Sequence, residues 1–188
     1  GIAKWRGEGV DFDVVCLGIP QQRNMVLFPE RIGGKYMRLE RPSNQWGDPF
    51  HIWYAFSPDM EYWGEQELFL GCEDVPWANR KIGAGAPPIK TDKGWLLVFH
   101  AVDEDPARRR DVLAGKGWCK RYTCGAALFG KDDPTRLAAI TRQPLIVAEA
   151  PYETGYDGIW VEDTIFPVGA ILNPHDTGEL MIYYGAGD

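Results

Sequence analysis

The stretch RNMVLFPERIGGKYMRLERP, Arg23 to Pro42, decides the fold class because its pattern is that of a β-hairpin. The apolar run Met25–Phe28 is typical of a buried strand. Tyr36–Leu39 alternates apolar and polar side chains, as a half-buried strand does. The pair Gly33-Gly34 marks the turn between them. We therefore predict two antiparallel strands in this stretch.

The ends of this hairpin carry its polar groups. Arg23 and Asn24 open the first strand, and Arg41 closes the second. In an antiparallel pair the start of one strand lies beside the end of the other, so these side chains meet at one edge. Guanidinium groups match the geometry of phosphate and carboxylate oxygens. We predict an oxyanion clamp at this edge; the alternative is a set of solvated side chains at strand ends.

Outward from the hairpin, the chain has the pattern of an all-β protein. Glycine (22) and proline (14) separate short runs of β-branched and aromatic residues. A weak internal repeat, in which proline and an apolar strand precede a glycine-containing turn and a second apolar strand, occurs in Leu27–Pro42, Gly85–Val102 and Ile165–Asp188. Repeated hairpins are typical of the four-stranded blades of a β-propeller. A β-sandwich with chance similarity is the alternative.

The segments between the repeats complete the expected blades. His51–Gly64 and Tyr122–Leu137 each pair a strand with a Pro-Asp or Asp-Pro turn, and trailing strands are expected at Gln66–Leu70 and Gln143–Val147. The chain is then a single domain, residues 1–188, of about three blades, whereas a closed propeller needs at least four. We expect either a fragment of a longer chain or a partner that completes the ring.

Composition narrows the classes of function. The net charge of −7 argues against a general role on nucleic acid or at a membrane surface. No apolar run approaches the roughly 20 residues that span a bilayer, and no signal peptide is visible at the start. The cysteines lack zinc-like spacing, so we expect free thiols, no metal and a reducing, cytoplasmic compartment, with a disulfide or a metal site as the alternative. They are Cys16, Cys72, Cys119 and Cys124.

Other candidate site residues stand at the ends of the predicted inner strands, which converge near a propeller axis. Lys81 opens a glycine-rich run that lets the backbone approach a ligand, although the run lacks the spacing of a P-loop. His100 ends the apolar strand Trp95–Phe99, where a lone histidine is more often structural. Asp163 and Asp188 are candidates for binding sugar hydroxyls or for acid–base work.

Aromatic residues are candidates for stacking on sugar rings, although most of the eight tryptophans should pack within the blades. The candidates are Trp46, Trp53, Tyr122, Trp160 and Phe166. The acidic pair in Gly71–Asp74 looks like a paired-carboxylate site, but the sequence offers no positioned partner for it. We interpret that pair as structural.

Ordered motifs along the chain resemble those of glycoside hydrolase family 130, the β-mannoside phosphorylases. They are N-x-x-L-F-P-E-K/R-I-x-G-K-Y-x-x-L-x-R-P from Asn24, S-P-D-x-x-x-W-G from Ser57, K-I-G-A-G-A-P-P-I-K-T-x-x-G-W-L-x-x-x-H-x-V from Lys81, F-P-x-G-A-I from Phe166 and Y-Y-G-A-x-D from Tyr183. The resemblance runs from about Arg23 to Asp188, and the segment Trp118–Thr123 is similar to one branch of the family.

The resemblance implies a five-bladed propeller that cleaves β-mannosidic linkages by phosphorolysis with inversion and releases mannose 1-phosphate. Its partners are then a mannose-containing oligosaccharide and inorganic phosphate as co-substrate; no cofactor or metal is implied, and a homo-oligomer is compatible with it. The positions that it assigns to phosphate are Arg23, Asn24, Arg41, Lys81, His100 and Tyr122. Those that it assigns to the sugar are Phe166 and Asp188, beside the candidate Asp163.

The general acid of the family is an aspartate in an E-D-P-R motif upstream of N-x-x-L-F-P, and this chain contains no E-D-P-R. We therefore expect a fragment that lacks the acid and is inactive alone, with the parent protein as the enzyme. A hydrolase of the same family and a non-catalytic, oligosaccharide-binding propeller are the alternatives. The cationic side chains favour the phosphorylase, because a water nucleophile needs a carboxylate base instead.

Overall fold

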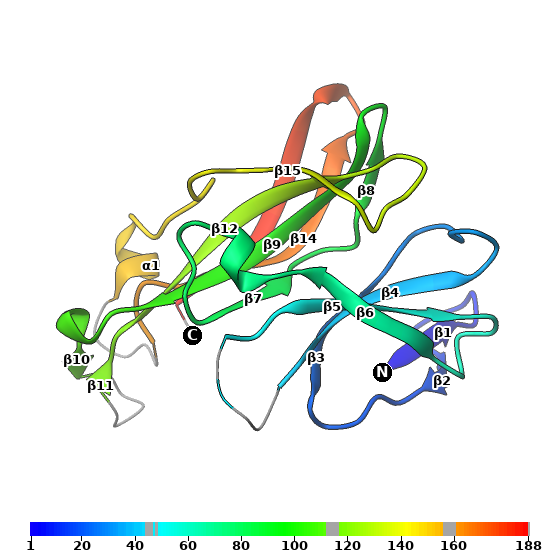
Figure 1. The fold of residues 1–188 in the computed structure, drawn as a ribbon, viewed down its shortest axis with the longest axis horizontal. Helices are drawn as coiled ribbons and strands as arrows, with labels where there is room; N and C mark the ends of the chain where they lie inside the picture. Colours follow the sequence, from blue (N-terminus) through cyan, green and yellow to red (C-terminus); the bar gives the residue numbers. More distant parts are fainter. Residues whose placement is uncertain (44–46, 48, 112–116, 156–160, 188) are drawn as a thin grey trace.

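Antiparallel β-sheets account for nearly all of the regular structure (Figure 1). The computed structural model describes residues 1–43, 47, 49–111, 117–155 and 161–187. Within them the helical segments are short: the 3-10 turns η1 (Cys72–Asp74) and η2 (Pro106–Arg108), and α1 (Pro151–Thr154). None of the helices in these ranges could cross a membrane. The prediction of an all-β fold is confirmed.

The first sheet grows from the opening hairpin and has four strands in chain order. They are β3 (Gln22–Leu27), β4 (Tyr36–Pro42), β5 (Ile52–Ser57) and β6 (Gly64–Leu70). Both predicted strands of the hairpin are present, with a turn in which Gly33 and Gly34 have φ values of 57° and 83°. Each strand pairs with its sequence neighbour, which is how a propeller blade is built.

The second sheet has the strand order β13-β12-β9-β7, with β8 also paired to β9. Its strands are β7 (Lys81–Ala84), β8 (Ile89–Thr91), β9 (Gly94–Glu104), β12 (Lys120–Phe129) and β13 (Leu137–Ile140). A two-stranded hairpin, β14 (Ile165–Asn173) and β15 (Asp176–Ala186), follows. Two blade-like sheets and this hairpin form the predicted partial propeller.

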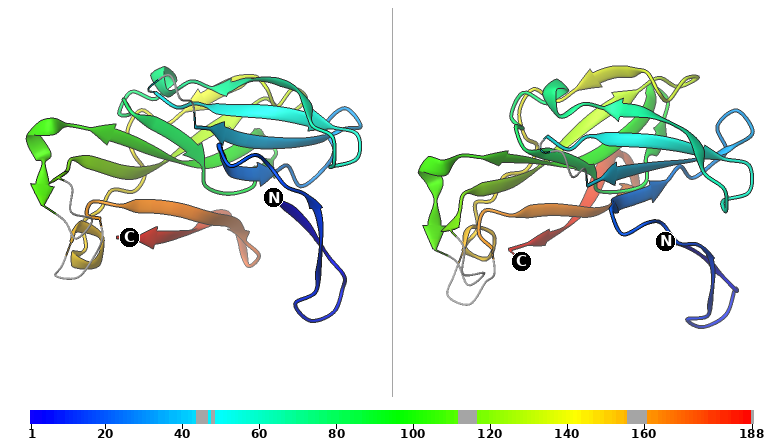
Figure 2. Two further views of the ribbon diagram at one scale, coloured as in Figure 1. Left: turned by 90° about the horizontal axis from the view of Figure 1, so that it is seen from below. Right: turned by 60° about the horizontal axis from the view of Figure 1, so that its bottom comes forward.

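Two small hairpins lie outside this series. The pair β1 (Ile2–Trp5) and β2 (Phe12–Cys16) projects from the two sheets, as Figure 2 shows. The pair β10 (Arg110–Asp111) and β11 (Gly117–Trp118) lies at the far end of β9 and β12.

One predicted strand is wrong. The outer strand of the second sheet is Leu137–Ile140, whereas Gln143–Val147 makes only an isolated bridge, Cys124 to Ile146. The cause is the tight turn after β12, closed by a hydrogen bond of 2.8 Å from the amide of Gly130 to the carbonyl of Arg136. The chain therefore returns along β12 at once, earlier than the trailing-strand pattern predicts.

The core lies between the layers, and β9 contributes to both of its parts. Leu97 and Phe99 pack with Leu39 and Ile52 of the first sheet, in the larger cluster of buried residues. Val98 packs in a second cluster, between the second sheet and the β14–β15 hairpin. Side chains alternate along a strand, so His100 shares the face of Val98 and is directed to the hairpin. The four cysteines are free thiols.

Candidate functional site

Arg23 and Arg41 are direct register partners across β3 and β4, so the predicted edge exists. The register shifts between Arg23 and Val26, which marks a bulge at Asn24. Asn24 has a φ of 52°, a backbone conformation that is uncommon for a residue other than glycine. Bulges redirect side chains and are frequent beside functional sites. Here the bulge places Asn24 beside the two arginines.

Strand β9 brings Lys81 and Tyr122 together from its two neighbours. Lys81 of β7 and Tyr122 of β12 are both register partners of Val102. Their side chains meet across β9, with the Lys81 ammonium nitrogen 5.0 Å from the centroid of the Tyr122 ring. The two sheets thus contribute cations to a common place, because β7 lies against β3 and β4.

His100 joins this group from the middle of β9. Its ring stacks on Phe166 of β14, with ring centroids 4.5 Å apart, and lies 6.1 Å from the ring of Tyr122. Its register partner on β7 is Gly83, where a Cβ atom would lie 2.4 Å from His100 Cε1 and 3.1 Å from Asn24 Oδ1. A side chain at position 83 would therefore displace both residues, so the glycine is needed for their close approach.

A single open cavity of about 450 Å³ is lined by all six residues of the predicted phosphate set and by Phe166. The structure thus brings together, from six strands of three layers, the residues Arg23, Asn24, Arg41, Lys81, His100, Tyr122 and Phe166. Hairpin geometry predicted that Arg23, Asn24 and Arg41 lie together. The expected convergence of inner-strand ends added Lys81 and His100, and family resemblance added Tyr122 and the phosphate role. Their ligand remains a prediction.

Several polar atoms of this cavity are buried without a hydrogen-bond partner among the described residues. They are Asn24 Oδ1, Arg41 Nε and His100 Nδ1. Arg41 is 6% exposed and His100 is 1% exposed, so water contributes little to solvating these groups. Unpaired buried polar atoms are costly, and native proteins retain few of them outside functional sites. Three such atoms around one cavity indicate a polar ligand.

The electrostatics of the cavity favour an anion. Burial, then the charges of Arg41, Lys120, Arg80 and Arg23, lower the pKa of Lys81 to about 8. Burial, then the charges of Arg41 and Lys81, lower the pKa of His100 well below its usual range, so its imidazole is neutral near pH 7. Burial is also the main cause of the lowered pKa of Arg41. The cluster is therefore a set of desolvated cations that an anion would stabilise.

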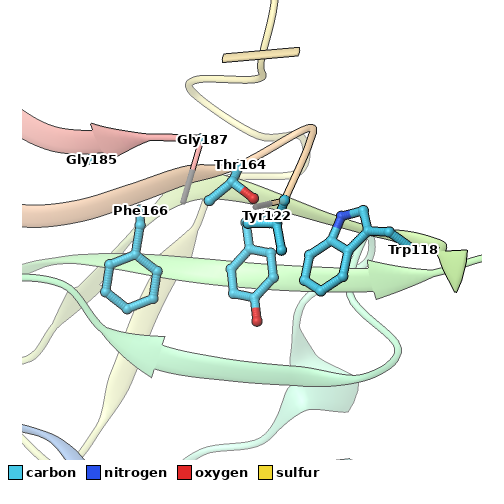
Figure 3. A pocket seen from close by; sticks show the side chains of 7 residues that line it. Trp118, Tyr122, Thr164, Phe166, Gly185 and Gly187 are labelled. Atoms are coloured by element: carbon cyan, nitrogen blue, oxygen red, sulfur yellow. The ribbon is translucent and has the colours of Figure 1, made fainter. Parts of the chain in front are cut away.

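A second cavity, of about 540 Å³, adjoins the first, because Tyr122 and Phe166 line both. Figure 3 shows the rings of Phe166, Tyr122 and Trp118 side by side, with Thr164, Gly185 and Gly187 nearby. Trp118 is not among the site residues predicted from the sequence. The even-spacing rule for one strand gave no signal for it, because Trp118 belongs to β11 and Tyr122 to β12.

Two of the remaining candidates, Asp163 and Trp53, lie outside both cavities. The carbonyl of Asp163 accepts a hydrogen bond of 2.9 Å from the amide of Tyr122, and Asp163 has a φ of 51°. Asp163 lines neither of the two cavities, although its neighbour Thr164 lines the second. Trp53 lines a separate cavity of about 460 Å³ next to Glu40. Trp46, Trp160 and Asp188 lie outside the described residues.

The acidic segments outside the cavities have structural partners. Asp74 in η1 accepts a hydrogen bond of 3.0 Å from the amide of Gly71, which agrees with a structural role. The run Glu104-Asp105-Pro106 partly matches E-D-P-R, but Asp105 caps η2 and Glu104 pairs with Arg80 at 2.8 Å. Among the described residues no group of three or more His, Cys, Asp or Glu side chains is placed to hold a metal ion.

Known mannoside phosphorylases are similar to this chain over most of its length. A family model described as β-1,4-mannooligosaccharide phosphorylase matches residues 7–188. A β-1,4-mannooligosaccharide phosphorylase from Ruminococcus albus is 36% identical over 171 residues, which is 90% of this chain and 46% of that protein. A β-1,2-mannobiose phosphorylase from Listeria innocua is 34% identical over 170 residues, which is 90% of this chain and 42% of that protein.

A solved structure agrees with the fold. The Listeria innocua β-1,2-mannobiose phosphorylase, in complex with β-1,2-mannobiose, matches with a TM-score of 0.71 and 32% identity, over 89% of this chain and 42% of that chain. The chain spans about half the length of the curated relatives it matches.

Proposed function

This chain belongs to glycoside hydrolase family 130, and from that premise we propose that the whole protein cleaves β-mannosides with inorganic phosphate, releasing mannose 1-phosphate. Because the chain spans about half the length of its curated relatives, the activity is proposed for the whole protein, and the cavity described above is its phosphate-binding part. Those relatives are named for β-1,2-linked, β-1,4-linked and mannosyl-glucose substrates, so the proposal is made for β-mannosides as a class.

The observation that carries the proposal is the convergence of Arg23, Arg41 and Lys81 on one cavity with Asn24 and a neutral His100. A phosphate group at neutral pH carries between one and two negative charges and several strong acceptor oxygens. Cations and N–H donors fixed in advance hold such an anion and offset its repulsion from the sugar oxygens that it approaches.

The same cavity is poorly suited to a water nucleophile. An inverting hydrolase activates water with a carboxylate base. Among the residues that the structure describes, the seven that line this cavity include no aspartate or glutamate. This residue set supports phosphorolysis over hydrolysis.

In the proposed reaction a phosphate oxygen attacks the anomeric carbon of mannose, the bond from that carbon to the acceptor oxygen breaks, and the configuration inverts. A carboxylic acid from outside this cavity donates its proton to the departing oxygen. The residues of this chain bind and orient the phosphate. No organic cofactor is needed, because phosphate is itself the nucleophile.

The activity is tested by incubating the whole protein, not this chain alone, with β-1,4-mannobiose, β-1,2-mannobiose or mannosyl-glucose, with and without inorganic phosphate. We expect mannose 1-phosphate only in the samples with phosphate. Free mannose released at equal rates in both would eliminate phosphorolysis. Binding of the disaccharide with no turnover under either condition would favour a non-catalytic sugar-binding propeller.

The phosphate site can be tested in the 188-residue chain without turnover. Calorimetric titration with inorganic phosphate should show binding to the wild type and weaker binding to Arg41→Met. Lys93→Met is the matched control, because Lys93 is an exposed cation outside the cavity. Equal phosphate affinity in all three proteins would contradict the assignment of the cavity.

A further inference from the structure

Trp118 continues the row of aromatic rings that begins in the proposed phosphate cavity. The planes of Trp118 and Tyr122 differ by only 5°, with ring centroids 6.1 Å apart. Figure 3 shows the two rings side by side, with Phe166 beyond Tyr122. The rings form a shelf that leads from the cavity of about 450 Å³ into the adjoining cavity of about 540 Å³.

The indole ring of Trp118 is held in place by a contact distant in sequence. Its Nε1–H donates a hydrogen bond of 2.9 Å to the carbonyl of Glu162. The residue is nevertheless not buried, and its ring lines the cavity. A large aromatic face that is fixed, partly exposed and next to a proposed nucleophile site is organised to contact a ligand.

The rest of this cavity leaves room for a ring on the shelf. Gly185 and Gly187 line it, and a Cβ atom built on Gly185 would meet no heavy atom closer than 4.0 Å, the carbonyl oxygen of Phe166. Lys120 adds an N–H donor, with its ammonium nitrogen 5.9 Å from the centroid of the Trp118 ring. An aromatic shelf with glycines nearby and a donor at its side matches a pyranose, which has apolar C–H faces and hydroxyl groups around its edge.

We propose that Trp118 is the stacking surface for the sugar residue next to the mannose that phosphate attacks, and so determines which acceptor sugars the site takes. This inference rests on the proposed function, because it takes the adjoining cavity as the phosphate site. It adds a specificity-determining residue outside the predicted set. The ligand class is a β-linked oligomannoside of at least two residues.

The test compares Trp118→Ala and Trp118→Phe with wild type by calorimetric titration with β-1,4-mannotriose and, separately, with inorganic phosphate. Loss of one stacked ring should weaken mannotriose binding roughly three- to tenfold. Phenylalanine should restore part of the loss, because it retains an aromatic face. The affinity for phosphate should not change in either variant. Trp5→Ala is the control, because Trp5 is an exposed tryptophan in the projecting β1–β2 hairpin.

A second variant fills the cavity beside the aromatic shelf and leaves Trp118 intact. Gly185→Leu should fill the cavity beside the shelf and abolish mannotriose binding, while phosphate affinity and melting temperature stay near those of wild type. Trp118→Ala also removes the hydrogen bond to Glu162, which could by itself disturb the structure around Glu162. Gly185→Leu keeps that hydrogen bond and therefore tests the sugar site independently.

Fluorescence gives an independent signature. Mannotriose should change the tryptophan emission of wild type and of Trp5→Ala, and should leave that of Trp118→Phe unchanged. Wild-type mannotriose affinity in both Trp118→Ala and Gly185→Leu would overturn the role of Trp118 and leave the phosphate proposal standing. Absence of phosphate binding in the wild type would instead overturn the proposed function.

Discussion

Arg23 and Arg41 lie directly opposite each other in the register of β3 and β4, so two like charges occupy facing positions in one hairpin. Such pairs destabilise a sheet, and Arg41 is in addition buried, with a pKa lowered mainly by that burial. This arrangement lowers the stability of the fold, and an anion bound between the two arginines would restore it.

Phosphate should therefore stabilise the chain through Arg41. Inorganic phosphate in excess over its dissociation constant should raise the melting temperature of the wild type, because a ligand that binds only the folded state shifts the unfolding equilibrium. In Arg41→Met we expect this increase to disappear, while the melting temperature without phosphate stays the same or rises. Arg142→Met, at an exposed arginine outside the cavity, should respond to phosphate as the wild type does.

The charge of Lys81 should likewise oppose stability and support binding. Its folded-state pKa of about 8 lies below the ordinary value of 10.5, so folding favours the neutral amine. The stability cost is therefore fully present below pH 8 and disappears as the pH rises toward 10.5. Lys81→Met should be more stable than wild type at pH 7 in urea denaturation, and this difference should vanish near pH 10.5.

The charge of Lys81, which lowers stability, should strengthen phosphate binding. Loss of one charge-assisted hydrogen bond should weaken phosphate binding by Lys81→Met at pH 7 by roughly ten- to a hundredfold. Wild-type affinity should decline as the pH is raised above 8, since the free amine carries no charge. Lys93→Met should match the wild type in both measurements. A pH-independent affinity between 7 and 9.5 would rule out Lys81 as a phosphate ligand.

Local pattern predicted the hairpin of Arg23 to Pro42, because its turn and both strands lie within one short stretch. The expected convergence of inner strands grouped Lys81 and His100 with Arg41, but it could not give their arrangement around one cavity, since the two sheets meet only through tertiary packing. Family resemblance supplied the assignment of these positions to phosphate. The neutral state of His100 depends on its burial among cations, which no pattern in the sequence indicates.

Two features of the structure were not predicted from the sequence, and each has a physical reason. The place of Trp118 depends on a hydrogen bond to Glu162, 44 residues away, which no local pattern records. The outer strand of the second sheet lies at Leu137–Ile140, since the turn that begins at Gly130 closes tightly and brings the chain back to β12 before Gln143.

Gly83 sets how closely the two sheets can approach at the site. In Gly83→Ala the added Cβ would lie 2.4 Å from His100 Cε1 and 2.7 Å from its Nε2, so the ring must leave its present position against Phe166. We expect weaker phosphate binding and a lower melting temperature. Gly64→Ala is the matched control, because a Cβ there meets no atom within 4 Å. Calorimetric titration of both variants checks this, and equal phosphate affinity would show that the close contact at Gly83 is not required.

On the opposite face of β4, the ion pair of Arg38 and Glu40 should anchor the strand that carries Arg41. Arg38 Nη2 lies 2.8 Å from Glu40 Oε2, and both side chains are almost completely buried. Glu40 also accepts hydrogen bonds from Gln22 and Gln66, at 2.9 and 3.1 Å. Glu40→Gln leaves the Arg38 charge buried and unpaired, so urea denaturation should show a loss of about 3–5 kcal/mol.

Two comparisons separate this effect from a general charge effect. Glu65→Gln breaks the exposed pair with Lys35 and should cost less than about 1 kcal/mol. The double variant Arg38→Met/Glu40→Met should recover most of the loss, because replacing both members of a buried pair by apolar side chains is often neutral. Side chains alternate along β4, so Arg38 and Glu40 lie on the face opposite to Arg41. If Glu40→Gln lost no more free energy of unfolding than Glu65→Gln, the Arg38–Glu40 pair could not be what fixes the strand that carries Arg41.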